Sequence, residues 1–526
     1  MKRQPKYGII LFALLAIVVF LPMLQGWFHW FPMKPLNGVT VATEKPVFSL
    51  DSYRSGEYAR QAEAYTSQHI GFREPIIRLY NQYLWDCYRK TYAKDVVAGK
   101  EDWLFYPQSV RDYYGQELLC WQPSVDEARE TFNHEVKYLN WARSILKENG
   151  VDLLVFIAPE KSFLYPEFLP ESESDTTTFN ACDYFSQRFE ETGFPYIEMT
   201  RWFQQIKDTV DYPLIPQAGA HWIFSSVYAV DSLTHLMGTL KGITLPKIEI
   251  GEAYPIRERD HDYDNDLEEL LNLTFPLKHQ YGYCPRHLVN ILQDSASVKP
   301  KVLFIGNSYF WSMNQFVPFN ELFEDTEFWY YFTTAYSGDS LNQTAKVIQL
   351  DLVEKLLDFD YVVWFTTGNQ LNKGTGDFAE RTILNLCYSE KDIGLTYTRI
   401  IDSLAISTLG ATTADSLERH KLWSIANRLV LDHPERYFAL LRADSLPEER
   451  NPRIKEIIAA KQIRKHPEEV ERLIGEVVKE LKSKPIMMQQ IEEKAAKHHR
   501  SVEEQTLSDA QWVVNDRIKN GVYKLE

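Results

Sequence analysis

One serine follows an apolar run and a glycine turn, as a nucleophile at the end of a strand would. Residues 302–305 read as a buried strand, Gly306 permits a tight turn, and Ser308 stands where the next helix would begin. In an open α/β sheet this position lies beyond the carboxyl end of a strand, where helix N–H groups can stabilise an oxyanion. The same pattern also occurs in ordinary loops, so a plain loop hydroxyl is the alternative for Ser308.

A serine hydroxyl attacks a carbonyl carbon only with a base within hydrogen-bonding reach, and histidine is a common base. Among the 13 histidines, His221 lies in the short loop "GAHW" directly before an amphipathic segment, which places it near a helix N-terminus. The sequence therefore indicates His221 as the partner of Ser308. A loop histidine packed beside Trp222 is the alternative.

The elements that would position these residues are short apolar runs separated by helix-length amphipathic segments. The runs are rich in β-branched and aromatic residues and read "VDLLVFIAP", "PYIEM", "KVLFIG", "EFWYYFTT" and "DYVVWFTT". They are apolar on both faces, which is typical of parallel strands that helices cover on both sides. Residues 96–400 are therefore predicted to form an open parallel α/β sheet flanked by helices.

Composition sets limits on the class of protein. With 526 residues, 44% of them apolar, the chain can bury a large core and hold more than one domain. The net charge of -16 argues against a nucleic-acid partner, which would require a basic surface. The five cysteines lack the paired spacing of a zinc site, and an odd number cannot all pair with one another. We expect no metal and no cofactor.

The N-terminus has the composition of a membrane anchor. Residues 1–7 carry three basic side chains, and residues 8–26 form an apolar run long enough to span about 30 Å of hydrocarbon. Bulky aromatic residues follow where a cleavage site would need small ones. The sequence thus predicts a cytoplasmic tip, a single-pass helix in the inner (cell) membrane and a periplasmic or otherwise extracytoplasmic body. A cleaved signal peptide is the alternative, and it would export the body as well.

Three other regions lie before, within or after the predicted sheet domain in the sequence. Residues 27–95 read as a linker and a helix that leads into the α/β domain, and residues 401–526 as a charged helical extension. The insert 245–299 carries aspartates at positions 260, 262, 264 and 266. A calcium loop starting at the first or second of these would need glycine sixth and glutamate twelfth, and neither register has both. The run is interpreted as a solvated acidic turn before a short helix.

Four motifs, in this chain order, resemble the SGNH hydrolase-like proteins of polysaccharide O-acetylation, the AlgJ and AlgX type. They are "VVAGKEDWLFY", "APEKSFLYPEFLP", "GAHW" and "VLFIGNSY", and the resemblance covers residues 66–369. Family members carry Asp-x-His-Trp and Gly-Asp-Ser sequences, so the resemblance implies His221 as the base and Ser308 as the acyl-accepting nucleophile. It also implies acetyl transfer to a polysaccharide outside the cytoplasm. The acyl donor would then come through a separate multi-spanning membrane O-acyltransferase.

Two positions depart from this family pattern. Gly219 stands where the family has the triad aspartate, and Asn307 replaces the aspartate before the serine. A triad aspartate orients the imidazole and stabilises the imidazolium, so another acidic side chain or a backbone carbonyl must take this role for catalysis. The sequence does not identify that group. Asn307 and Gly306 are expected to support the turn and the oxyanion.

Four more residues are candidates for the site. Asn369 follows the last apolar run and can donate to an oxyanion, or it is a plain turn asparagine. Lys161 and Tyr165, in the second motif, follow a predicted strand where a substrate would lie, and Trp222 adjoins the histidine. Lys161 and Tyr165 would either bind substrate or cap the structure.

Three functions are consistent with these features. The first is a membrane-anchored O-acyltransferase that forms a Ser308 acyl-enzyme, with His221 as general base and then general acid. The second is an esterase that passes the acyl group to water. The third is a non-catalytic polysaccharide-binding scaffold, because a fold does not fix an activity.

Overall fold

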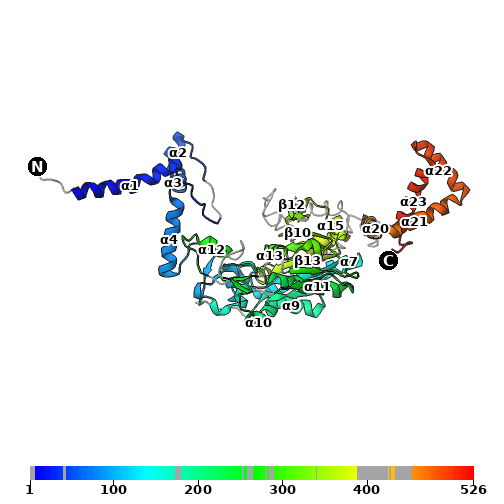
Figure 1. Ribbon diagram of the computed structural model, residues 1–526, viewed down its shortest axis with the longest axis horizontal. Coiled ribbons are helices and arrows are strands. Elements are labelled where there is room, and N and C mark those ends of the chain that lie inside the picture. The colour runs from blue at the N-terminus through cyan, green and yellow to red at the C-terminus, as the bar shows by residue number, and fades with distance from the viewer. Residues whose placement is uncertain are drawn as a thin grey trace.

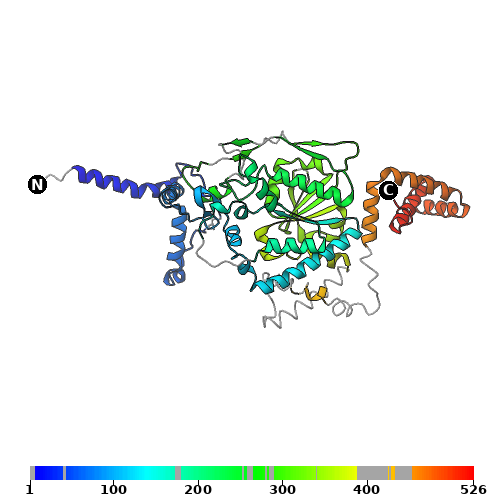
Figure 2. The ribbon, with the colours of Figure 1, turned by 90° about the horizontal axis from the view of Figure 1, so that it is seen from below.

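The computed structural model describes residues 6–38, 43–171, 179–251, 254–256, 265–278, 281–283, 289–338, 340–387, 425, 428–432 and 453–525. A sheet flanked by helices forms the centre of the molecule, with the N-terminal helix at one end and the C-terminal helices at the other (Figures 1 and 2). The predicted α/β fold, with an apolar N-terminal helix and a helical C-terminal region, is confirmed.

The central sheet has seven strands in the order β12-β11-β10-β9-β13-β3-β4. The five strands from β10 to β4 run parallel, and β11 and β12 extend the sheet by antiparallel pairing. In chain order the strands are β3 (Asp152–Ala158), β4 (Tyr196–Glu198), β9 (Lys301–Gly306), β10 (Asp325–Tyr330), β11 (Thr334–Ser337), β12 (Asn342–Lys346) and β13 (Tyr361–Thr367).

The sheet is mostly parallel, as predicted, and the sequence did not indicate its antiparallel edge. The run "EFWYYFTT" is apolar throughout, but β10 ends inside it at Tyr330. Tyr331 and Phe332 both take a left-handed backbone conformation, with φ of 49° and 54°, and reverse the chain into β11. Hydrophobicity alone does not show such a reversal, because the turn residues are as apolar as the strand.

Alternating strand residues build a separate core on each face of the sheet. In β3, Leu153, Val155 and Ile157 are fully buried in one apolar cluster, and Leu154, Phe156 and Ala158 in the other. Burial of each large side chain contributes about 1.5–3 kcal/mol. Helices α7 (Val125–Glu148), α9 (Ala181–Thr192), α15 (Leu352–Asp358) and α16 (Phe378–Cys387) cover one face, and α10 (Met199–Ile206), α11 (Ser226–Lys241) and α13 (Tyr309–Phe316) the other.

The N-terminal region begins with α1 (Lys6–Phe28), which is long and apolar enough to cross a membrane; no other helix in the described ranges is. Helices α2 (Leu50–Arg54), α3 (Glu57–His69) and α4 (Arg73–Tyr88) follow. The turn between α3 and α4 contacts α1 closely: the Gly71 amide donates to the Pro22 carbonyl at 3.0 Å. A Cβ on Gly71 would lie 2.4 Å from that oxygen, so only glycine fits there.

The described parts of the insert form regular elements that its sequence did not indicate. Strand β5 (Lys247–Ile250) pairs with β8 (Val289–Leu292), β6 (Tyr254–Ile256) pairs with β7 (Tyr281–Tyr283), and α12 (Asp266–Leu271) lies between them in the chain. Positions 260, 262 and 264 of the acidic run lie outside the described residues. The remaining short elements are β1 (Val97–Ala98), β2 (Leu104–Phe105), α5 (Pro107–Tyr113), α6 (Leu118–Trp121), α8 (Lys161–Leu164), α14 (Phe319–Leu322) and the 3₁₀ segment η6 (Gly368–Lys373).

The C-terminal helices form a bundle with its own apolar core. It consists of α20 (Arg453–Lys465), α21 (Pro467–Lys482), α22 (Pro485–His498) and α23 (Val502–Lys519). Ser501 and Glu504 form a capping box that satisfies N–H groups at the start of α23. Helix α20 is joined to the sheet domain, where the Lys461 ammonium donates to the Phe359 carbonyl at 2.6 Å and Lys465 pairs with Asp360.

Candidate active site

Ser308 lies two residues after the end of β9, which is the middle strand of the seven-stranded sheet. It is the N-cap residue of α13, yet its side chain makes no capping hydrogen bond. A serine at this position normally accepts from an N–H group of the first helical turn. Here the Tyr309 amide is bound instead by Asn307 Oδ1 at 3.1 Å, which leaves the Ser308 hydroxyl to point toward the loop that carries His221.

A continuous hydrogen-bond chain joins three side chains from distant parts of the sequence. His221 Nε2 lies 2.7 Å from Ser308 Oγ, and His221 Nδ1 lies 2.5 Å from Asp266 Oδ2. The imidazole is thus bound on both sides, by a hydroxyl and by a carboxylate. This is the order of contacts in a serine, histidine and aspartate triad.

The start of α12 holds Asp266 in place. Its second oxygen, Oδ1, accepts from the Ala220 amide at 2.7 Å, and the Glu268 amide donates to the Ala218 carbonyl at 3.1 Å. Leu267 and Leu271 are buried in an apolar cluster under the same helix. The helix is therefore fixed against the loop before His221, and Asp266 supplies the carboxylate that Gly219 cannot supply.

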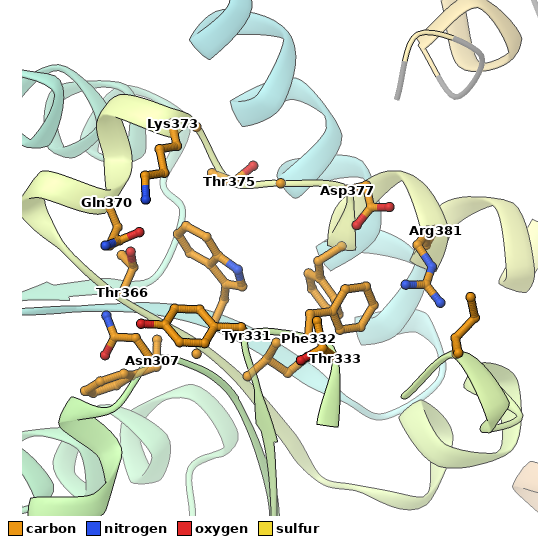
Figure 3. A pocket seen from close by; sticks show the side chains of 18 of the residues that line it. Asn307, Tyr331, Phe332, Thr333, Thr366, Gln370, Lys373, Thr375, Asp377 and Arg381 are labelled. Carbon is orange, nitrogen blue, oxygen red and sulfur yellow. The ribbon is translucent and has the colours of Figure 1, made fainter. Parts of the chain in front are cut away.

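A cavity of about 190 Å³ opens beside the serine. Its lining includes Tyr106, Ser109, His221, Ser308, Tyr331 and Asn369. Tyr331 lines this cavity together with Ser308, and with Asn307 it also lines a neighbouring pocket (Figure 3). Burial raises the pKa of Tyr331 to about 12, so this tyrosine is neutral at ordinary pH. A neutral hydroxyl next to the serine can donate a hydrogen bond to a reacting oxygen.

The predicted oxyanion and support residues surround this cavity. Gly306 is required by packing, because a Cβ there would lie 2.1 Å from the Phe365 carbonyl oxygen on β13. Asn307 is buried and holds the turn through the Tyr309 amide. Asn369 lines the cavity, and its Oδ1 accepts from Thr367 at 2.7 Å. The amide nitrogen is therefore the end of Asn369 that can donate to a ligand.

Lys161 holds the loops of the site together. Its side chain is 3% exposed, and its Nζ lies within 3.0 Å of the carbonyl oxygens of Leu104, Pro216, Gln217 and Gly219. Burial lowers the pKa of Lys161, while four carbonyl acceptors favour the ammonium form with its three donors. The nitrogen is occupied by the loop before His221, so of its two predicted roles the structure favours positioning over substrate binding.

Tyr165 and Trp222 belong to the core beneath the site. The Tyr165 hydroxyl accepts from the Leu214 amide at 2.8 Å, and its ring packs on Trp103. Trp222 is fully buried and donates from Nε1 to the Tyr309 carbonyl at 2.9 Å. Neither side chain lines the cavity, because both pack the elements that carry His221 and Ser308. Of the two roles considered for Tyr165, the structure favours capping, and a role for either residue in substrate binding stays a prediction.

Glu160 is a buried acid in the same cavity that the sequence did not indicate. Its carboxyl group accepts one hydrogen bond from Ser109 Oγ at 2.6 Å and another from the backbone N–H of Asn369 at 3.0 Å. Burial, together with the nearby Asp112 carboxyl, raises the pKa of Glu160 to about 7. This group fixes the turn at Asn369 and so positions a candidate oxyanion donor.

Asp266, Tyr331 and Glu160 are the residues of the site that the sequence did not indicate. Asp266 ends the acidic run that was interpreted as a solvated turn, and its signal was only that an acid precedes a short helix. Tyr331 lies within a run that resembled one continuous strand, and Glu160 lies directly before the lysine of the second motif. No local pattern distinguishes these three from ordinary acidic or aromatic residues.

The fold is that of an SGNH hydrolase-like protein, an open α/β sheet with a serine at the start of the helix that follows a central strand. Residues 96–324 match the model of the family described as "SGNH hydrolase-like domain, acetyltransferase AlgX". Over these residues, which are less than half of the chain, the sequence is similar to this family, whose description is that of an acetyltransferase. The match confirms the resemblance of the sequence motifs. A comparison with curated protein sequences gave no match.

Three solved structures are similar to part of this chain at low identity. The O-acetyltransferase domain of Pseudomonas putida AlgJ is 14% identical, with 53% of this chain and 92% of that chain covered and a TM-score of 0.35. Pseudomonas aeruginosa AlgX is 13% identical, and the match covers 54% of this chain and 68% of AlgX with a TM-score of 0.33. Bacillus cereus PatB1 is 12% identical, and the match covers 52% of this chain and 96% of PatB1 with a TM-score of 0.32.

Proposed function

We infer that the protein transfers an acyl group, most simply acetyl, through an ester on Ser308 to a hydroxyl of a polysaccharide. The observation that carries this proposal is the chain of hydrogen bonds from Asp266 through His221 to Ser308. A scaffold protein has no use for a carboxylate, an imidazole and a hydroxyl in this order. The sugar acceptor rests on the family match and on the resemblance of the sequence motifs.

The reaction has two halves that use the same residues in opposite directions. In the first, His221 Nε2 takes the Ser308 proton as Oγ attacks the acyl carbonyl, and the imidazolium then protonates the leaving alcohol. In the second, His221 deprotonates the sugar hydroxyl, which attacks the acyl-serine and releases Ser308. Asp266 stabilises the imidazolium in both halves. Asn369 and Tyr331 are the side chains suited to stabilise the oxyanion.

The proposal places this reaction outside the cytoplasm with the protein anchored by α1. Basic residues before an apolar helix orient its N-terminus toward the cytoplasm. A single helix cannot form a path through the bilayer, so an acyl group from the cytoplasm would need a separate multi-spanning membrane protein as its carrier. The acceptor polysaccharide and the anchored enzyme would then share one compartment.

Acyl-enzyme formation tests the proposal directly. The full-length protein in detergent is mixed with p-nitrophenyl acetate, quenched in acid and analysed by peptide mass spectrometry. We expect an acetyl group on Ser308 in the wild type and none at that position in Ser308→Ala. Addition of oligosaccharides should then yield acetylated sugar.

Three outcomes separate the alternatives. Acetylated sugar supports transfer, whereas acetate released at the same rate with and without sugar indicates an esterase. Identical traces for the wild type and Ser308→Ala would reject both enzymes and leave a binding protein.

A further inference from the structure

Helix α4 carries an apolar stripe that the rest of the protein leaves exposed. The stripe consists of Ile76, Leu79, Tyr80 and Tyr83, which follow one another at steps of one, three or four residues and so share one face of the helix. Each of these residues is between 50% and 59% exposed. Single exposed apolar residues are common, but four together on one helix face form a surface suited to an apolar partner.

The opposite face of α4 is fixed to the body of the protein. Trp85 is buried in the apolar cluster that contains Leu271 of α12, and the Asn81 side chain donates to the Leu271 carbonyl at 2.8 Å. The Arg78 guanidinium donates to two carbonyl oxygens of the linker that follows α1. With about 3.6 residues per turn, these three residues lie across the helix from the stripe. The stripe is therefore held facing away from the body.

The turn between α3 and α4 packs against the last turns of α1. The Gly71 amide donates to the Pro22 carbonyl at 3.0 Å, and a Cβ on Gly26 would lie 2.8 Å from the His69 carbonyl oxygen. The Phe72 ring, directly before α4, lies 6.3 Å from the Phe31 ring. In both views α4 runs across the direction of α1 and not along it (Figures 1 and 2).

Exposed aromatic rings gather at this same end of α1. Trp27, Phe28, Trp30 and Phe31 are all more than half exposed. Tryptophan and tyrosine concentrate at the boundary between membrane and water, because the ring is apolar and its N–H or O–H group remains hydrated. If α1 spans the bilayer, this end of α1 marks the boundary, and a helix that crosses it runs along the membrane surface.

We propose that the stripe of α4 is a lipid-binding surface that lies in the headgroup layer of the membrane spanned by α1. The inference rests on the anchoring by α1 in the proposed function and is independent of the chemistry at Ser308. Ile76 and Leu79 would reach the acyl chains, while the hydroxyl groups of Tyr80 and Tyr83 stay among the headgroups, as in other interfacial helices. The contact would hold α4, and with it α12, in one orientation to the bilayer.

Depth measurements on the full-length protein in vesicles test this inference. The vesicles consist of phosphatidylethanolamine and phosphatidylglycerol. The exposed Cys87 and Cys120 are changed to serine, and a bimane fluorophore is attached to Ile76→Cys or Tyr83→Cys. Doxyl-labelled lipids quench a fluorophore in the bilayer, whereas iodide quenches one in water. The protein with both serine changes and no added cysteine gives the background labelling.

A label on the C-terminal bundle is the matched control. Trp512 is an exposed aromatic residue of α23, and α23 lies at the end of the molecule opposite to α1 (Figures 1 and 2). We expect the ratio of lipid to iodide quenching to be about tenfold higher for the Ile76 and Tyr83 labels than for Trp512→Cys.

An added charge tests whether the apolar character of the stripe matters. Leu79→Glu should reduce lipid quenching of the Ile76 label by about half or more, since a carboxylate disfavours the apolar layer. Leu507→Glu is the control, because Leu507 is an exposed leucine of the distant helix α23. It should leave the quenching unchanged.

Each outcome decides the inference. If the protein stays in the vesicles and iodide quenches the Ile76 and Trp512 labels equally, the stripe faces water and the lipid contact is overturned; a protein partner would then be the occupant to seek. Release of the protein from the vesicles would reject both the anchor and the lipid contact, yet leave Ser308 acetylation untouched. Lipid quenching without any ester on Ser308 would support the lipid contact and reject the proposed chemistry.

Discussion

Asp266 is the residue on which the candidate site most depends after the serine and the histidine. In the Asp266→Asn variant an amide replaces the carboxylate, so the imidazolium loses its countercharge and Nδ1 can be held in the wrong tautomer. We expect the rate of Ser308 acetylation to fall about 10³ to 10⁴-fold, as for other triads that lose this carboxylate. Quenched-flow mass spectrometry with p-nitrophenyl acetate measures this rate.

Glu269→Gln is the matched control, since it removes one negative charge from the same helix at a position that does not line the cavity. It should change the rate less than about threefold, because its charge does not contact His221. Equal losses in the two variants would mean that the charge of α12, and not the contact with His221, is responsible.

Local sequence indicates Ser308 and His221, but not the group that completes the chain. Each of the two lies in a short motif whose surroundings can be read within ten residues. Asp266 lies 45 residues beyond His221, inside an insert whose fold depends on tertiary packing. The aspartate's role is set by the Ala220 amide and by the burial of Leu267, and neither is visible in a linear pattern.

Glu160 gives a prediction about pH and stability. Its pKa is raised from 4.5 to about 7, so the folded protein keeps a proton that the unfolded chain has already lost. The contribution of Glu160 to folding is thus favourable at low pH and is lost as pH rises from about 4.5 to about 7. Across that window the free energy of unfolding of Glu160→Gln should gain about 3 kcal/mol relative to the wild type.

Urea denaturation of both proteins at a series of pH values between 4 and 8 measures this difference. The comparison removes the effect of other buried acids, such as Glu135 and Glu380, because they are present in both proteins. Parallel curves for the two proteins across the window would contradict the raised pKa.

At the scale of elements, periodicity is a good guide where a strand is buried on both faces. All seven residues of β3 and of β13 are buried, and their apolar runs predict both strands from sequence alone. The β10–β11 reversal could not be predicted, because its turn contains tyrosine and phenylalanine where glycine or asparagine would mark a turn. The turn presents Tyr331 to the cavity beside Ser308.

Gly306 couples the strand to the site, and its replacement tests that coupling. A Cβ would lie 2.1 Å from the Phe365 carbonyl oxygen, so β9 and β13 must separate in Gly306→Ala. We expect a loss of at least about 2 kcal/mol in the free energy of unfolding. Gly475→Ala in α21 is the control, because nothing lies within 4 Å of the added carbon. The free energy of unfolding of Gly475→Ala should rise by up to about 1 kcal/mol. Equal stability of the two variants would contradict the close approach.

The whole molecule links its N-terminal helices to the site through α12. Asn81 of α4 donates to the Leu271 carbonyl at 2.8 Å, and the Asn37 amide donates to Asn272 Oδ1 at 2.7 Å. Trp85 of α4 is buried in the same cluster as Leu271. The segment that follows the proposed anchor therefore helps to position the helix that carries Asp266.

The proposed anchor itself is tested by extraction from membranes. Full-length protein should remain in the membrane at alkaline pH in carbonate, whereas a chain lacking residues 1–28 should be released. Ile17→Arg places a charge in the middle of α1 at a cost of about 2.5–3.5 kcal/mol and should weaken retention, whereas Ile17→Leu should not. Sequencing of the mature N-terminus completes the test. A chain that begins after residue 26 would mean that α1 is a cleaved signal. The enzyme would then reach its polysaccharide as an exported protein without an anchor.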